Sequence, residues 1–409
     1  MDAEKTIRPS GQCEPETAPP SGEGTLAARQ SGTLVALFAI GFFAFLNLYT
    51  TQPLLPQFRH FFMASELLVS FTVSAPVLAV TLTAFMIGLV ADAVGRKRVI
   101  IAAVFGLSLP TILAGTSANL GQLVMWRFWQ GLFIAGITSV TIAYISEESP
   151  SKSLGSIMAT YVTGTVVGGF VGRFSAGFIS ARYGWRISFI VLGVATMAGA
   201  IAAWSLLPRS TKFIRHRNIV QALKPMWGHL KNPPLLATYA TGFNVLFCLV
   251  GTFTYVNFYL ADKPFLLGPT ALALIFVVYL VGVVITPLAG RFMDRVGQRK
   301  VLMGAAGMSA TGMAMTLIHS LPLIIAGLAL VASGVFACHS ASASHVGKAA
   351  REARSSAAGL YISFYYLGGF AGSVIPGILW KYAGWRGCVA IMIFMQLIAI
   401  LIANRWWQR

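Results

Sequence analysis

Charged residues are scarce in this sequence. Asp, Glu, Lys and Arg make up 10% of its 409 residues, whereas soluble globular proteins carry about 25%. Hydrophobic residues make up 56%, and the mean hydropathy is +0.73. This composition excludes a soluble globular protein and predicts an integral membrane protein. Because each membrane span takes about 20 apolar residues, twelve spans and their loops leave no room for a large soluble domain.

Cysteines and acidic residues are also few. Three of the four cysteines, Cys248, Cys338 and Cys388, lie in apolar stretches, where a lone cysteine packs as a small hydrophobic residue, and we expect no disulfide. Five of the 12 acids fall within residues 1–32. The others fall in or beside the expected loops: Glu66, Asp92, Glu147, Glu148, Asp262, Asp294 and Glu352. No carboxylate is therefore expected at the middle of the membrane.

Long apolar runs follow a polar N-terminal segment. Residues 1–32 are rich in Pro, Gly, Ser and Glu and are predicted to form a disordered tail. The runs predict an all-α membrane protein with twelve transmembrane helices. Two six-helix bundles, at 33–207 and 234–404, are joined by a basic linker at 208–233 and followed by a short tail at 405–409. The expected spans are 33–55, 68–91, 99–116, 122–145, 154–180, 187–207, 234–260, 270–293, 301–318, 321–345, 356–380 and 387–404.

Lys and Arg are distributed unevenly between the two faces of the membrane. Of these 30 residues, 22 fall in the termini, the linker and the loops on their side, and six fall in the opposite loops. Arg127 and Arg173 fall inside spans. Since basic loops remain in the cytoplasm, both termini and the linker are predicted to be cytoplasmic, in a cell inner membrane. The net charge of +18 is then a topology signal, and we expect no nucleic-acid partner.

The two halves of the chain repeat one another at an offset of about 200 residues. Gly88-Leu-Val-Ala-Asp92-Ala-Val-Gly95-Arg96-Lys97-Arg98 recurs as Gly290-Arg-Phe-Met-Asp294-Arg-Val-Gly297-Gln-Arg299-Lys300. Tyr161, Gly168, Gly169, Gly172 and Gly177 recur as Tyr361, Gly368, Gly369, Gly372 and Gly377, and Gly184-Trp185-Arg186 recurs as Gly384-Trp385-Arg386. Halves of the same topology predict a parallel repeat about an axis along the membrane normal, with a binding site between them near the midplane.

The repeated loop, Gly-x-x-x-Asp-x-x-Gly-Arg-Lys/Arg, resembles the signature of the major facilitator superfamily. The resemblance covers essentially everything after the tail. Within the superfamily the chain resembles bacterial twelve-helix efflux-type members similar to the YnfM-type inner-membrane transporters. The residues that carry this resemblance are Tyr144-Ile-Ser-Glu-Glu148, Gly164 to Arg173, Ala337-Cys-His339-Ser340 and Leu360 to Gly369. It implies a secondary transporter that works by alternating access, and we expect a monomer without a cofactor.

The resemblance also implies that the two motif copies act as latches, which hold the cytoplasmic ends of the halves together in the outward-facing state. The expected latch residues are Gly88, Asp92, Gly95, Arg96 and Lys97 in the first copy and Gly290, Asp294, Gly297, Arg299 and Lys300 in the second. Because Gln298 replaces the first arginine of the motif, we expect the second latch to be weaker. The alternative is a pair of solvated loops that only set the topology.

Arg127 is the clearest charge expected inside the membrane. It shares a helical face with Gln130 and Gly131, and the cost of exposing a charge to lipid predicts that it faces the protein interior. The segment resembles the fourth-helix motif of proton-coupled members, which implies that Arg127 and Gln130 act in proton coupling. The alternative is an arginine that extends to the outer surface. His339, in the tenth span, is a further candidate to carry a proton, or else a hydrogen-bonded structural residue.

Arg173 lies deep in the fifth span, at a position where family antiporters carry glycine. It is a candidate to bind an anionic or hydroxyl-rich solute, or to pair structurally. Other candidates to line a solute pocket, each of which could instead only pack, are Asn47, Tyr49, Gln52, Asn244, Tyr255, Asn257, Tyr361 and Tyr365. Since no carboxylate is expected at the midplane, we disfavour organic cations and favour neutral polar or anionic solutes.

Three functions remain open. We expect a transporter that exports a small-molecule solute in exchange for protons, within the lipid bilayer. Direction cannot be read from sequence, so an importer of a similar solute is the alternative within this class. A non-transporting membrane sensor is the alternative from another class. The sequence contains no nucleophile and base at depth, metal cluster or phosphate-binding loop, so we expect no enzyme, no ATP-driven pump and no metal site.

Overall fold

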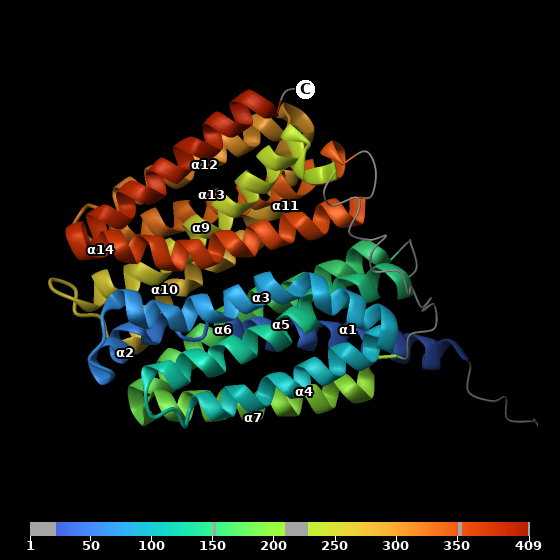
Figure 1. The fold of residues 1–409 in the computed structure, drawn as a ribbon. Helices are drawn as coiled ribbons and strands as arrows, with labels where there is room; N and C mark the ends of the chain where they lie inside the picture. Colours follow the sequence, from blue (N-terminus) through green and yellow to red (C-terminus); the bar gives the residue numbers. More distant parts are fainter. Residues whose placement is uncertain (1–21, 150–152, 209–227, 351–353, 408–409) are drawn as a thin grey trace, which may run out of the picture.

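Two bundles of helices lie side by side, one from each half of the chain (Figure 1). The computed structural model describes residues 22–149, 153–208, 228–350 and 354–407. The first bundle contains α1 (Gly22–Leu48), the 3-10 helix η1 (Gln52–Leu54), α2 (Leu55–Phe61), α3 (Glu66–Val94), α4 (Arg96–Ala114), α5 (Leu120–Glu148), α6 (Leu154–Tyr183) and α7 (Trp185–Leu206). The second contains α9 (Pro233–Ala261), α10 (Pro269–Ile275), the 3-10 helix η2 (Phe276–Leu280), α11 (Val281–Val296), α12 (Gln298–Met315), α13 (Leu321–Ala349) and α14 (Arg354–Trp406).

The helices agree with the predicted membrane spans. Within the described residues, ten helical stretches are long and apolar enough to cross a bilayer. The last of them, Ala357–Trp406, contains both the eleventh and the twelfth predicted spans, because α14 continues through a kink at Gly384. The ninth predicted span is α12. The predicted all-α fold of two bundles is therefore confirmed.

Three boundaries differ from the sequence prediction. Helix α1 begins at Gly22 rather than at 33, so residues 22–32, which we expected in a disordered tail, are helical. The first predicted span ends early, since α1 stops at Leu48 and prolines at the first turns of η1 and α2 start new helices. The eighth span is divided into α10, η2 and α11. Residues 1–21 of the expected tail and 209–227 of the expected linker lie outside the described residues.

Repeated glycines set the spacing of one helix pair in each bundle. Gly168 on α6 lies so close to α1 that a Cβ atom there would be 2.1 Å from the Phe42 carbonyl oxygen. Glycines let helix backbones approach closely inside a membrane protein. The same kind of contact recurs one turn away on either side, where Gly164 and Gly172 of α6 approach α1. It recurs again in the second bundle, where Gly368 and Gly372 of α14 approach α9. The internal repeat of the sequence is therefore a repeat of helix packing.

Gly95 and Gly297 occupy the same place in the two copies of the repeated loop. Both have positive φ angles, 109° and 87°. Gly95 separates α3 from α4, and Gly297 separates α11 from α12. Because a side chain is rarely tolerated in this conformation, the turn itself explains why both copies carry glycine there.

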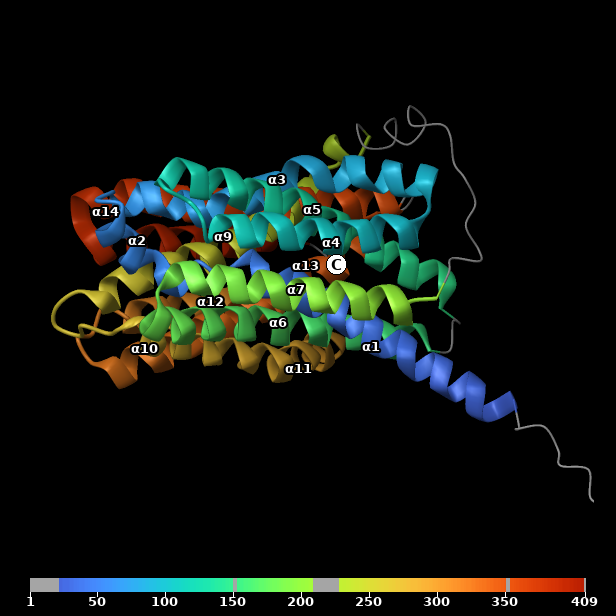
Figure 2. The same ribbon diagram turned by 90° about the horizontal axis from the view of Figure 1, so that it is seen from below.

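The two bundles contact one another near one end of the molecule. We call this the α2 end, because α2 and the turn between α9 and α10 lie there; at the other, the linker end, α7 ends and α9 begins (Figure 1). Seen from below, α1 extends past the other helices at the linker end (Figure 2). Toward the α2 end, Gly177 on α6 abuts Pro269 and Ala273 of α10, and Gly377 on α14 abuts Leu67 of α3. Because Gly177 and Gly377 are equivalent positions of the internal repeat and each contacts the opposite bundle, the interface has approximate twofold symmetry.

Candidate functional site

Arg127 on α5 is fully buried inside the first bundle and binds main-chain carbonyl groups. Its Nε donates to the Thr72 carbonyl oxygen at 2.8 Å and its Nη1 to the Asn47 carbonyl oxygen at 2.7 Å, while Nη2 donates to the Leu48 carbonyl. Asn47 and Leu48 close α1, where helix carbonyls lack partners within the helix. The guanidinium caps α1 and complements the negative end of its dipole. The prediction that Arg127 faces the interior is confirmed.

Gln130 and Asn47 extend this network across the first bundle. Arg127 also donates to the Gln130 side-chain oxygen, and Gln130 Nε2 donates to the Thr111 hydroxyl at 3.0 Å. The same hydroxyl lies 3.0 Å from Asn47 Oδ1, and Asn47 Nδ2 donates to the Thr196 hydroxyl at 2.9 Å. Asn47 therefore joins α1, α4 and α7 within one bundle.

Arg173 on α6 lies at the contact between the two bundles, with 3% of its surface exposed. Its guanidinium carbon is 4.8 Å from the ring centre of Tyr49 in the first bundle. It is 4.9 Å from the ring of Phe276 and 4.8 Å from that of Tyr279, both on η2 of the second bundle. A guanidinium at such distances is attracted to aromatic faces. This buried positive charge therefore contacts both halves of the protein.

Gln52 connects Arg173 to the second bundle. Its Oε1 accepts a hydrogen bond from Arg173 Nε at 2.8 Å, and its Nε2 donates to the Thr254 hydroxyl on α9 at 3.3 Å. Arg173 Nη1 donates to the Gly169 carbonyl oxygen at 2.6 Å. Among the residues that the structure describes, no carboxylate pairs with Arg173. Since a buried charge is costly without an opposite charge, this guanidinium is suited to receive an anion.

Three aromatic residues of the second bundle form a cluster nearby. The ring of His339 on α13 lies 4.8 Å from that of Tyr365 on α14, and His339 Nδ1 is 3.3 Å from the Tyr361 hydroxyl. Tyr365 also lies near Tyr49 of the first bundle and Tyr279 of η2. The predicted site residues Tyr49, Gln52, Arg173, Tyr361 and Tyr365 thus lie in one region, together with His339.

The other pocket candidates, all on α9, make contacts inside the second bundle. Asn244 Nδ2 donates to the Met395 carbonyl of α14, and the Tyr255 hydroxyl donates to the Ser373 carbonyl at 2.7 Å. Asn257 Nδ2 donates to the carbonyl of Phe253 on its own helix at 2.6 Å. Its buried Oδ1 has no hydrogen-bond partner among the described residues. Asn244 and Tyr255 thus hold α9 against α14. The side-chain oxygen of Asn257 can still accept a hydrogen bond.

The expected latch residues make their described contacts within their own bundles. Arg96 Nη2 lies 2.6 Å from Glu147 Oε1, and Lys97 donates to the Leu207 carbonyl. Arg299 donates to the Asn404 side chain of α14. The remaining ones are Gly290 on α11, the turn residues Gly95 and Gly297, and the exposed Asp294 and Lys300. Gly88 and Asp92 lie on α3, and their surroundings are outside the described part of the structure. The latch function stays a prediction.

Phe276, Tyr279 and Thr254 belong to the Arg173 site, although no sequence pattern singles them out. They stand among many similar residues in apolar spans, and no spacing or charge marks them. Their proximity to Arg173 depends on how the second bundle packs against the first. Charge and polarity in apolar surroundings mark Arg173 and Gln52 in the sequence, but they do not mark the second-bundle residues that contact them.

Comparison with known proteins gives four findings. A model described as Major Facilitator Superfamily matches residues 37–278 and 263–409. The inner membrane transport protein YnfM of Escherichia coli is 31% identical over 381 residues, 92% of this chain and 90% of that protein. The uncharacterized MFS-type transporter YybF of Bacillus subtilis is 30% identical over 370 residues, 90% of this chain and 92% of that protein. A solved structure of a bacterial homologue of the human lysosomal transporter Spinster, inward-facing and unoccupied, aligns with a TM-score of 0.76 at 17% identity, covering 92% of this chain and 96% of that one.

Proposed function

Because the chain belongs to the major facilitator superfamily, we propose that this multi-pass membrane transporter moves a small anionic or neutral polar solute, which binds at Arg173 between the two bundles. The solute gains access to each side of the membrane in turn as the bundles rock around this site. The observation that carries the proposal is the buried Arg173, which contacts both bundles and has no described carboxylate partner.

The surroundings of Arg173 favour an anion over a cation. Tyr49, Phe276 and Tyr279 present aromatic faces to the guanidinium, and Gln52 already uses its carbonyl oxygen to accept from it. A carboxylate or a similar anion would bind the guanidinium with two parallel hydrogen bonds. A cationic solute would meet a like charge at this site.

We further propose that transport is export coupled to protons, with His339 as the proton carrier and Arg127 with Gln130 supporting the coupling. Histidine is the residue type whose unperturbed pKa lies nearest to physiological pH, and His339 contacts Tyr361 and Tyr365 beside the proposed solute site. We propose that both termini and the linker are cytoplasmic, which follows from the basic loops on that side. The structure is then closed toward the outer face at the α2 end.

A binding screen followed by an exchange assay tests the proposed function. The purified protein is heated with a panel of organic anions, sugars and organic cations, and the compound that raises the unfolding temperature most is carried forward. We expect an anion or a hydroxyl-rich solute. The Arg173→Gln variant should lose this stabilisation, whereas Arg182→Gln, an exposed arginine on the same helix, should keep it. Equal stabilisation of Arg173→Gln, or stabilisation by cations alone, would contradict the proposal.

The same solute then separates a transporter from a sensor. Proteoliposomes loaded with unlabelled solute should take up labelled solute by counterflow, and Arg173→Gln should abolish it. Binding without counterflow would favour the sensor. An imposed pH gradient of either sign then distinguishes exchange with protons, which indicates export, from movement with protons, which indicates import.

A further inference from the structure

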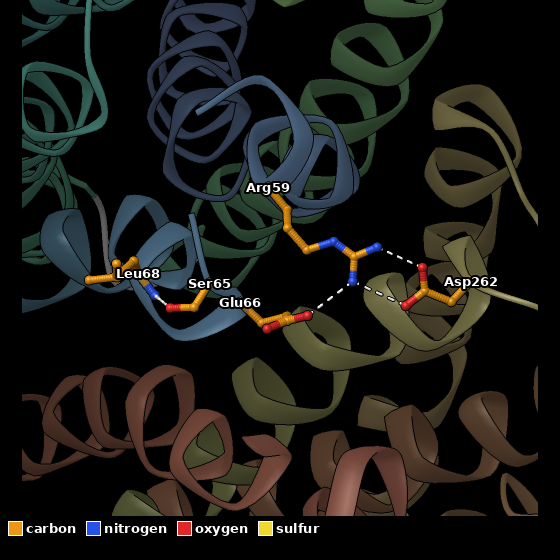
Figure 3. A network of polar contacts seen from close by, with 5 residues as sticks. All are labelled: Arg59, Ser65, Glu66, Leu68 and Asp262. Atoms are coloured by element: carbon orange, nitrogen blue, oxygen red, sulfur yellow. Dashed lines mark hydrogen bonds and ion pairs between the residues drawn. The ribbon is translucent and has the colours of Figure 1, made fainter. Parts of the chain in front are cut away.

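Arg59 joins the two bundles at the α2 end through an ion pair (Figure 3). It lies in the last turn of α2, and its Nη2 is 2.6 Å from Oδ1 of Asp262, the residue that follows the end of α9 in the second bundle. Its Nη1 is 3.1 Å from Asp262 Oδ2, so the contact is bidentate. The same Nη1 is 3.0 Å from Oε1 of Glu66, which lies on α3 in the first bundle. One guanidinium therefore serves two carboxylates from opposite halves of the protein.

The two carboxylates differ in their need for Arg59. Glu66 lies in the first turn of α3, where a negative charge is favoured by the helix dipole, and Ser65 caps the same helix end. Asp262 lies at the C-terminal end of α9, where the dipole disfavours a negative charge. The Arg59 guanidinium also lies 5.9 Å from the ring centre of Phe258 on α9. The contacts across the bundles therefore compensate a charge that its own helix does not stabilise.

The ion pair is accessible to water. The side chain of Asp262 is 48% exposed and that of Arg59 is 18% exposed. Asp262 also lines an open cavity of about 390 Å³, together with Lys263, His319 and Arg386. A partly hydrated ion pair contributes little to overall stability, so it can break and form again within a transport cycle.

We propose that Arg59 is a partner-switching gate residue: bound to Asp262 it holds the α2 end closed, and when the bundles separate there it remains bound to Glu66. This proposal rests on the alternating-access part of the proposed function. Glu66 lowers the cost of opening because it keeps the arginine paired in the open state. In the closed state Glu66 also repels Asp262 across the shared guanidinium. The two carboxylates therefore act on the gate in opposite directions.

Distance measurements on the full chain without solute test this proposal. Nitroxide labels are placed at Tyr183→Cys on α6 and Tyr382→Cys on α14, in a background with the native cysteines replaced by alanine. Both tyrosines are exposed and lie near the α2 end of opposite bundles. Pulsed electron paramagnetic resonance in lipid nanodiscs then measures the fraction of molecules with the longer, open distance.

We expect Asp262→Asn and Arg59→Gln to raise the open-to-closed ratio about fivefold, the value of a partly exposed ion pair. Combining them should add nothing further, because both remove the same contact between the bundles, that of Arg59 with Asp262. Arg59→Lys, which keeps the charge but loses the bidentate geometry, should have an intermediate effect. Glu66→Gln should leave the ratio unchanged or lower it, and Lys263→Gln, which removes a neighbouring exposed charge, should leave it unchanged.

Two results would overturn the proposal. One is an unchanged distance distribution in Asp262→Asn; the other is opening by Glu66→Gln as large as that by Asp262→Asn. Labelled protein that remains monodisperse in every variant excludes misfolding as the cause of a change. Because no solute is present, failure of the gate proposal is distinct from failure of the proposed function, which would appear as a solute screen without a hit.

Discussion

Arg127 donates a hydrogen bond from Nε to the carbonyl oxygen of Thr72, at 2.8 Å. Within α3 this carbonyl would normally accept from the main-chain nitrogen four residues later, but that residue is Pro76, which has no N–H. The Thr51 hydroxyl approaches the same oxygen at 3.4 Å. Arg127 therefore replaces the hydrogen bond that the proline removes, in addition to capping α1. These contacts give the buried arginine a structural role beside the coupling role proposed for it.

Replacing Arg127 with glutamine should lower the free energy of unfolding by about 3 kcal/mol, because several buried carbonyl groups lose their donor. The free energy of unfolding of Arg127→Lys should lie between those of the wild type and Arg127→Gln, since one ammonium cannot span the positions of three guanidinium nitrogens. Thermal unfolding of the purified protein in detergent measures both. Arg182→Gln, at an exposed arginine, is the control and should unfold like the wild type. A wild-type unfolding temperature for Arg127→Gln would refute the structural role.

Gly168→Ala should lower the free energy of unfolding by about 2 kcal/mol, the usual cost of forcing extra volume into a packed contact. The added Cβ would be 2.1 Å from the Phe42 carbonyl oxygen, and backbone cannot move aside as a flexible side chain can. Gly155→Ala, on the same helix with no neighbouring atom within 4 Å of the added carbon, is the matched control. It should be neutral or slightly stabilising, since alanine favours helix. If both variants unfold at the same temperature, the contact between α6 and α1 does not limit stability.

Arg173→Lys should weaken binding of the solute about tenfold although the charge is kept. Lysine is a compact cation that cannot bind an anion with two parallel hydrogen bonds or stack flat on aromatic rings. The guanidinium of Arg173 lies within 4.9 Å of three ring centres. Titration of the solute that the thermal screen identifies gives the dissociation constant. Wild-type affinity in Arg173→Lys would show that charge alone is recognised.

His339→Gln should separate exchange from proton coupling. Glutamine can still hydrogen-bond the Tyr361 hydroxyl, which lies 3.3 Å from His339 Nδ1, but it cannot carry a proton near neutral pH. Solute counterflow, which needs no gradient, should continue in proteoliposomes, whereas accumulation driven by a pH gradient should stop. Gradient-driven accumulation at the wild-type level would exclude His339 as the carrier.

Much of the fold could be predicted because its signals are local. Long apolar runs define spans, and Gly95 and Gly297 mark the same turn because only a residue without a side chain tolerates its positive φ. The break after Leu48 was missed, since an apolar run looks the same whether the helix continues or restarts at a proline. The helical residues 22–32 were missed because polar, glycine-containing composition was taken to indicate disorder.

The candidate site was predictable only in part. Arg173, Tyr49 and Gln52 stand out as polar groups in apolar surroundings, so sequence alone selects them. Asn47 and Asn244 stand out equally, yet they hydrogen-bond within their own bundles. The rotation of each helix about its axis decides which polar residues face the region between the bundles. Because a membrane helix carries apolar residues on all sides, its sequence does not determine this rotation.

The membrane class, the two-bundle repeat and the interior location of Arg127 could all be predicted from the sequence, because each follows from transfer energies along single helices or from identity between the two halves. Which groups pair depends instead on how the helices pack. Arg127 bonds a carbonyl 80 residues away in the chain, and Arg59 pairs with Asp262 across 203 residues. Such pairs form only when two helices pack in one particular relative position. The residue pattern of either helix alone does not predict that position.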